Sequence, residues 1–138
     1  MAHRILFLEH DEDDAYITKT FFSELNIPVQ LEVVTSPEDA EAMLAQSVKK
    51  GEKLPDLFLM DYNALPDNAG KFIGKLTSNL HFSSMPVIVL RGVADPRIVK
   101  ECYANGASSF IEKPADSAEI RRKISVFVEY WFGCVELP

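Results

Sequence analysis

The stretch RILFLEHDEDD (residues 4–14) joins a short apolar run to a cluster of five acids and one histidine. The apolar part, residues 4–8, has the length and composition of a buried strand. The segment that follows, residues 13–25, places its apolar side chains at helical spacing. A strand that leads directly into a helix is the repeating unit of a parallel α/β fold.

The same alternation of apolar runs and amphipathic segments continues along the chain. The expected strands are residues 4–8, 30–34, 56–60, 86–90 and 108–112. The expected helices are residues 13–25, 36–50, 70–80, 96–106 and 115–132. This pattern predicts a (βα)₅ fold, which is a doubly wound parallel sheet with helices on both faces. Five strands favour the strand order 2-1-3-4-5.

Length, charge and hydropathy narrow the class of protein. The chain has 138 residues, close to the size of one domain, and a net charge of −7, which argues against direct nucleic-acid binding. No apolar run approaches the ~20 residues needed to span a bilayer, and the N-terminus lacks the features of a signal peptide. We therefore expect a cytoplasmic protein that binds neither nucleic acid nor membrane.

Charged side chains stand where the predicted strands end. They are Glu9, His10, Asp11, Asp61, Arg91 and Lys113. Because the carboxyl ends of parallel strands meet at one edge of the sheet, these residues should converge. Asp61 follows four apolar residues, where an uncompensated carboxylate would be costly.

Converging carboxylates indicate a cation site, since they would repel the phosphate of a nucleotide or flavin. Mg²⁺ is the usual partner of such oxygen ligands, and a lysine opposite suits phosphoryl transfer. A structural explanation stays open for part of the set. Glu9 and Asp11 could be acids that complement a helix dipole, and Lys113 could be a surface lysine.

Five segments together carry a resemblance to a known family. They are ILFLEHDEDD (5–14), PDLFLMDYNALP (55–66), MPVIVL (85–90), GASSFIEKP (106–114) and the ending EYWFGCVELP (129–138). In order and spacing, the first four resemble the receiver domain of two-component response regulators, which has a flavodoxin-like fold. The ending is similar to that of single-domain regulators associated with phytochromes.

The resemblance implies a role for each matching residue. Asp61 would be the phosphoacceptor, and Lys113 would contact the phosphoryl group. Glu9 and the residue after it would form the acid pair that binds the metal, and the backbone carbonyl of Asn63 would be a further ligand. Phe110 would occupy the aromatic switch position, and Pro114 would follow a peptide bond that is often cis in the family.

The resemblance also implies a function. Residues 1–138 would form a single receiver domain without an output domain, and the protein would be a signalling component rather than an enzyme. A sensor histidine kinase would transfer a phosphoryl group to Asp61, and the resulting change would alter partner binding. The resemblance of the ending makes a phytochrome-like kinase the candidate.

Three departures from the family pattern affect this expectation. His10 replaces the metal-binding aspartate, Arg91 replaces the usual threonine or serine, and the loop after Asp61 has one extra residue before its proline. Imidazole suits Mg²⁺ poorly, so we expect weakened binding, a preference for Mn²⁺, or no metal unless Asp11 replaces the lost ligand. Arg91 could supply some of the missing positive charge, or it could pair with Asp61 and hold the site in one state.

Two alternatives to a phosphorylated switch follow. One is a pseudo-receiver, a protein-interaction module that is not phosphorylated. A more distant one is a metal-dependent phosphatase, whose usual second aspartate is Asn63 in this chain.

The last helix and its tail, residues 115–138, bear on self-association. Core positions on this helix are expected at Ile120, Ile124, Val128 and Trp131. Additional apolar side chains occur at Val126, Tyr130, Val135, Leu137 and Pro138. We predict that this excess apolar surface forms a homodimer contact.

Overall fold

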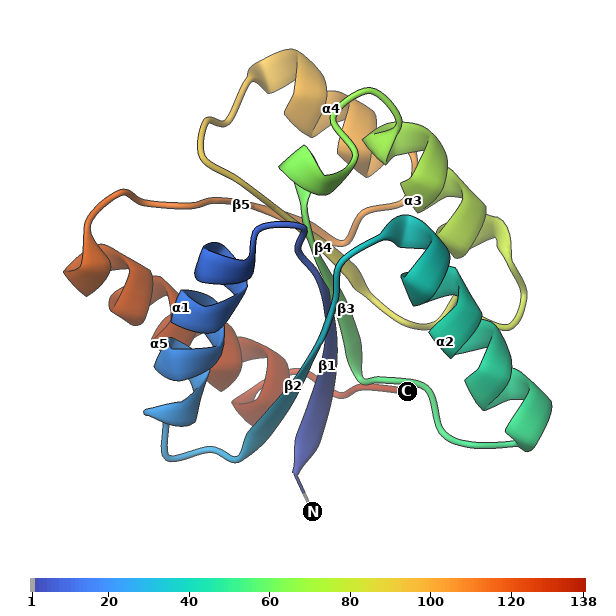
Figure 1. The fold of residues 1–138 in the computed structure, drawn as a ribbon, viewed down its shortest axis with the longest axis horizontal. Helices are drawn as coiled ribbons and strands as arrows, with labels where there is room; N and C mark the ends of the chain where they lie inside the picture. Colours follow the sequence, from blue (N-terminus) through green and yellow to red (C-terminus); the bar gives the residue numbers. More distant parts are fainter. Residues whose placement is uncertain (1) are drawn as a thin grey trace.

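The computed structural model describes residues 2–138, which form one five-stranded parallel sheet flanked by helices (Figure 1). The strands are β1 (His3–Leu8), β2 (Val29–Val34), β3 (Leu57–Asp61), β4 (Val87–Arg91) and β5 (Ser109–Glu112). Their order in the sheet is β2-β1-β3-β4-β5, and every neighbouring pair is parallel. The predicted fold class and strand order are therefore confirmed.

Helices cover both faces of the sheet. They are α1 (Glu12–Ser23), α2 (Pro37–Lys50), the 3₁₀ helix η1 (Tyr62–Ala64), α3 (Ala69–Ser78), α4 (Pro96–Ala104) and α5 (Ser117–Gly133). Helices α1 and α5 lie on one face, and α2, α3 and α4 lie on the other (Figure 1). Each face has its own apolar core, because successive residues of a strand point to opposite sides of the sheet.

The register of the sheet brings the carboxyl ends of the strands together. Asp61 lies opposite Leu90, and Arg91 lies opposite Glu112. Strands β3 and β4 thus run one residue further than the sequence predicted, because the ladder continues past their apolar segments.

Helix α2 begins and ends at the predicted signals, whereas the other helices differ from their predicted bounds by one or two residues at one or both ends. The Ser36 hydroxyl accepts a hydrogen bond from the Asp39 N–H at 3.1 Å, and α2 ends at Gly51, whose φ is +68°. Helix α1 begins one residue earlier than predicted. Asp11 is its N-cap, and the Asp11 carboxylate accepts hydrogen bonds from the N–H groups of Asp13 and Asp14 at 2.9 and 3.0 Å.

The sequence predicts that the apolar side chains of the C-terminal tail lie outside the core, but part of the tail packs against it. Leu137 packs against the core on the α1/α5 face, and the Phe132 ring stacks on His3 with ring centroids 4.2 Å apart. The core positions predicted on α5 are confirmed for Val128, which is fully buried, and for Trp131, which packs on the same core.

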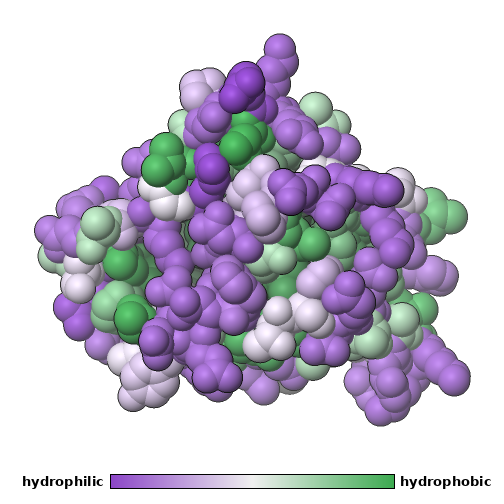
Figure 2. All heavy atoms as spheres, turned by 45° about the horizontal axis from the view of Figure 1, so that its top comes forward, coloured by the Kyte–Doolittle hydropathy of each residue, from purple (hydrophilic) through white to green (hydrophobic). Residues whose placement is uncertain are grey.

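The surface at the carboxyl end of the sheet is mainly polar. Figure 2 turns this end toward the viewer and shows hydrophilic residues over most of it, with small separate hydrophobic patches. Among residues 2–138, no helix is both long enough and apolar enough to cross a membrane.

Candidate functional site

Asp61 lies at the centre of the pocket formed by the strand ends. It is the last residue of β3, and only 3% of its surface is exposed. One carboxylate oxygen, Oδ1, accepts a hydrogen bond from the Asn63 N–H at 2.8 Å, and the other, Oδ2, lies 3.2 Å from Lys113 Nζ. The expected convergence of Asp61 and Lys113, which are 52 residues apart, is therefore seen.

Lys113 links two carboxylates from different elements. Its ammonium group lies 3.2 Å from Asp61 and 3.7 Å from Asp14 at the start of α1. Burial alone would lower the pKa of Lys113, but the attraction and hydrogen bond of Asp61, together with Asp14, raise it. Lys113 thus remains cationic beside Asp61 and is not a free surface lysine.

Glu9 follows β1 and is the most deeply buried acid of the pocket, with 1% of its surface exposed. Its Oε1 accepts a hydrogen bond from the Asp11 N–H at 3.1 Å, whereas Oε2 has no hydrogen-bond partner among the described residues. Burial first, and then the adjacent Asp61 carboxylate, together raise the pKa of Glu9 from its ordinary 4.5 to about 8. Without a cation, Glu9 therefore carries a proton near neutral pH.

The environment of Glu9 and Asp61 fits a bound divalent cation. The buried carboxylates of Glu9 and Asp61 lie side by side, and Oε2 of Glu9 lacks a hydrogen-bond partner among the described residues. A cation would offset the repulsion between the two carboxylates and would also bind the unpaired oxygen. Within residues 2–138, no three His, Cys, Asp or Glu side chains converge into a metal cage by themselves. A cation would therefore need backbone carbonyl and water ligands in addition to Glu9 and Asp61, as Mg²⁺ sites commonly have.

His10 and Asp11 lie at the rim of this pocket. The His10 side chain is 52% exposed, and its Nδ1 lies 3.9 Å from Glu9 Oε1. Asp11 caps α1, and the hydrogen bonds from the N–H groups of Asp14 and Asp13 lower its pKa. One Asp11 oxygen is therefore engaged with the helix, and Asp11 as a replacement metal ligand stays a prediction.

Arg91 does not pair with Asp61, contrary to one of the two expectations. Within the described part of the chain, no ion pair joins them; Asp61 pairs with Lys113 instead. The Arg91 guanidinium donates a hydrogen bond to the Val93 carbonyl at 3.1 Å and lies over the Tyr62 ring, 5.0 Å from its centroid. No pattern in the sequence singles out Tyr62, which is buried directly after Asp61.

Phe110 and Pro114 lie in and after β5. The Phe110 ring packs against the core on the α2/α3/α4 face, and its N–H donates to the Tyr103 hydroxyl at 3.1 Å. The expected cis bond before Pro114 is wrong, because the described residues contain no cis peptide bond. Hydrogen bonding of the Lys113 N–H to the Arg91 carbonyl at 2.7 Å holds this segment along β4.

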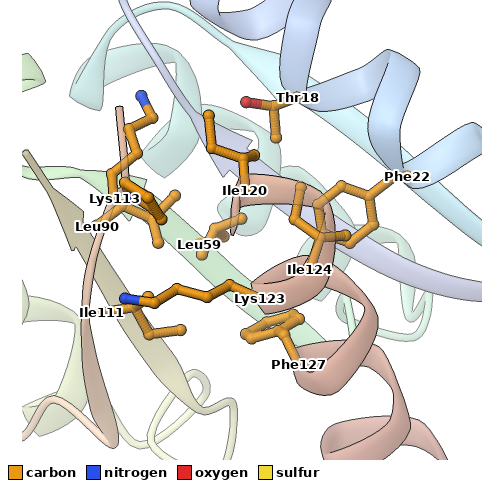
Figure 3. A pocket seen from close by; sticks show the side chains of 11 residues that line it. Thr18, Phe22, Leu59, Leu90, Ile111, Lys113, Ile120, Lys123, Ile124 and Phe127 are labelled. Atoms are coloured by element: carbon orange, nitrogen blue, oxygen red, sulfur yellow. The ribbon is translucent and has the colours of Figure 1, made fainter. Parts of the chain in front are cut away.

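An apolar cavity lies behind the pocket, between the sheet and helices α1 and α5. Figure 3 shows Thr18, Ile120, Ile124 and Phe127 around it, with the Lys113 ammonium directed away from these side chains. A charged group is disfavoured in such surroundings. The cavity therefore helps to direct the ammonium of Lys113 toward the carboxylates.

Comparison with solved structures supports this description of the fold. The cyanobacterial phytochrome response regulator RcpA, solved in its phosphorylated form, superposes with a TM-score of 0.88 at 20% identity, covering 100% of this chain and 99% of RcpA. The Mn²⁺-bound form of the response regulator Rcp1 superposes with a TM-score of 0.84 at 20% identity, covering 99% of both chains. At these identities, the likeness shows the fold alone.

Sequence comparison gives the family. The probable methanogenesis regulatory protein FilR2 of Methanothrix harundinacea (strain 6Ac) is 22% identical over 134 residues, which are 97% of this chain and 86% of FilR2. The family model of the response regulator receiver domain matches residues 5–125. Since that match covers most of the chain and the fold agrees with it, the protein belongs to the family of response regulator receiver domains.

Proposed function

We propose that this receiver domain accepts a phosphoryl group on Asp61 from a sensor histidine kinase and then changes its binding to a partner. The observation that carries the proposal is the contact between a buried Asp61 and the ammonium of Lys113, at 3.2 Å. Residues 1–138 act as one signalling domain and not as an enzyme. Their resemblance to phytochrome-associated regulators makes a phytochrome-like kinase the first partner to test.

The chemical step is a phosphoryl transfer between two side chains. A carboxylate oxygen of Asp61 forms a bond to phosphorus, while the bond between phosphorus and the imidazole nitrogen of the kinase breaks. The electron pair of that bond stays on the imidazole, which takes up a proton from solvent. The Lys113 ammonium offsets the negative charge of the phosphoryl oxygens during the transfer.

Mg²⁺ or Mn²⁺ is the proposed metal. Glu9, Asp61 and the backbone carbonyl of Asn63 would hold it, and it would supply positive charge next to the phosphoryl oxygens. His10 lies at the rim and contributes no carboxylate, so we expect weaker Mg²⁺ binding than an aspartate would give, with Mn²⁺ as the better-tolerated metal.

A second copy of this chain is the other proposed partner. Val126 and Tyr130, one helical turn apart on α5, are 54% and 52% exposed beside a groove between α5 and β5. Phe110, proposed as the aromatic switch residue, lines the same groove. A change at Phe110 on phosphorylation would therefore occur on β5, the strand that borders the proposed dimer contact.

Incubation with acetyl phosphate and Mg²⁺ or Mn²⁺, followed by intact-mass spectrometry, tests the proposed acceptor. We expect one phosphoryl adduct on the wild-type protein and none on Asp61→Asn. Asp67→Asn is the matched control, because Asp67 is an exposed acid in the loop after η1. Absence of an adduct with both cations and with a cognate kinase would overturn the proposal in favour of a pseudo-receiver that binds partners without phosphorylation.

A further inference from the structure

Arg91 is a cation held by neutral partners close to the proposed phosphorylation site. Its Nη1 donates to the Val93 carbonyl at 3.1 Å, and its guanidinium carbon lies 5.0 Å from the centroid of the Tyr62 ring. No carboxylate pairs with Arg91 anywhere in residues 2–138, although the protein has 21 acidic residues. Its guanidinium is therefore free to bind an anion without breaking an ion pair.

The backbone fixes Arg91 between the two groups that the phosphoryl group would contact. Asp61 lies opposite Leu90, so Arg91 is one residue beyond it on the neighbouring strand. The Arg91 carbonyl accepts a hydrogen bond from the Lys113 N–H at 2.7 Å. A long, flexible side chain that starts at this point is well placed to approach a group attached to Asp61.

We infer that Arg91 is a second cationic ligand of the phosphoryl group on Asp61, and that it leaves Val93 and Tyr62 to bind that group. This inference rests on the proposed function. A guanidinium offers two parallel N–H groups to a phosphate, and such charge-assisted pairs are stronger than a bond to a neutral carbonyl. Both carboxylate oxygens of unphosphorylated Asp61 already have hydrogen-bond partners, the Asn63 N–H and the Lys113 ammonium. This explains why Arg91 does not pair with Asp61 in the unphosphorylated protein.

The movement of Arg91 would act on the loop between β4 and α4. Side chains hold this loop at two successive residues. Arg91 binds the Val93 carbonyl, and Glu112 accepts a hydrogen bond from the Ala94 N–H at 3.0 Å. Departure of Arg91 removes the first of these contacts and leaves Val93, whose surface is 68% exposed, free to change position. Phosphorylation would thereby alter the surface near the start of α4.

The test uses beryllofluoride with Mg²⁺ as a phosphoryl mimic, with binding followed by fluorine NMR. We expect Arg91→Gln to bind it about tenfold more weakly than the wild type, because a charge-assisted pair is lost. Arg91→Lys keeps the charge but not the paired N–H groups, so its affinity for beryllofluoride should lie between those of the wild type and Arg91→Gln. Arg97→Gln is the matched control, since Arg97 is an arginine of α4 whose side chain is 92% exposed.

Amide hydrogen exchange of residues 91–99 provides the second measurement. Beryllofluoride should increase exchange in this loop in the wild type and in Arg97→Gln, but not in Arg91→Gln at concentrations that saturate it. Equal affinity and equal loop response in the wild type and Arg91→Gln would overturn the inference alone. Tighter binding by Arg91→Gln would also overturn it, because Arg91 would then block the site. If the wild type neither binds beryllofluoride nor takes up phosphoryl from acetyl phosphate, the proposed function fails together with the inference.

Discussion

Glu9 combines features that are costly for a single side chain. Its carboxyl group is buried next to Asp61, and Oε2 has no partner among the described residues. Among the described residues, no side chain fully compensates a negative charge there, so the group retains its proton, with a pKa of about 8. The folding stability of the metal-free protein should therefore depend on pH through this one residue.

The direction of that dependence follows from the raised pKa. Between its ordinary value of 4.5 and about 8, Glu9 keeps its proton in the folded state and loses it in the unfolded state. Stability is therefore highest below this window and falls as pH rises through it. We expect the wild type to lose about 3 kcal/mol of stability through Glu9 between pH 5 and pH 8, and Glu9→Gln, which has no proton to lose, to lack this fall.

Urea unfolding in EDTA at a series of pH values measures this difference. Glu12→Gln is the control, because Glu12 is an exposed acid in the first turn of α1 and should leave the pH profile unchanged. Parallel profiles for the wild type and Glu9→Gln would show that Glu9 is not protonated in the folded state.

The sequence predicts which residues meet in the pocket better than it predicts how they are oriented. Asp61 and Lys113 follow from strand position alone, because parallel strands must end at one edge of the sheet. Asp11 could not be recognised as a helix cap, because it stands among five acids that are all acceptable near a helix start. The direction of Arg91 depends on the Tyr62 ring and the Val93 carbonyl, which only the folded loop brings within reach.

At the scale of the elements, the ends of helix α2 can be predicted from the residues next to them, whereas the ends of β3 and β4 cannot. The serine–proline start and glycine end of α2 depend on neighbouring residues only, so the sequence predicts both. Strands β3 and β4 end one residue later than predicted, because a ladder of hydrogen bonds with another strand extends them. Boundaries set by pairing partners are not encoded in the segment itself.

Two glycines with positive φ allow the cost of backbone strain to be compared with the cost of steric crowding. Gly51 ends α2 with a φ of +68°, and a Cβ added there would meet no atom within 4 Å. Gly106 follows α4 with a φ of +107°, and an added Cβ would lie 2.6 Å from Thr77 Oγ1, whose hydroxyl donates to the Asn105 carbonyl. We expect Gly51→Ala to cost about 1 kcal/mol and Gly106→Ala about 3 kcal/mol.

Chemical unfolding of the two variants measures both costs under the same conditions. Combining Thr77→Ala with Gly106→Ala should restore part of the stability that Gly106→Ala loses, because Thr77→Ala removes the hydroxyl and methyl groups that crowd the added Cβ. Equal losses for the two glycine variants would show that contact with Thr77 does not contribute.

At the scale of the whole molecule, the α5 face is the surface on which self-association should depend. Because Leu137 packs against the core, the proposed contact is narrower than the sequence suggested and centres on Val126 and Tyr130. A charge placed in a buried apolar contact is unfavourable. We expect the wild type to be a dimer in multi-angle light scattering and Val126→Glu or Tyr130→Glu to be a monomer.

Leu80→Glu serves as the control for these variants. Leu80 is 91% exposed but follows α3, away from the α5 face, so its replacement should leave the dimer intact. A monomeric wild type at high concentration would contradict the proposed dimer.

The strand order also determines when each half of the pocket is made. Strand β1 pairs with both β2 and β3, so the first 61 residues contain a three-stranded sheet that carries Glu9 and Asp61. Arg91 and Lys113 belong to β4 and the segment after β5, which leave the ribosome later. During synthesis, the carboxylates of the pocket therefore leave the ribosome before its cations, and charge balance in the pocket requires the second half of the chain to join the sheet.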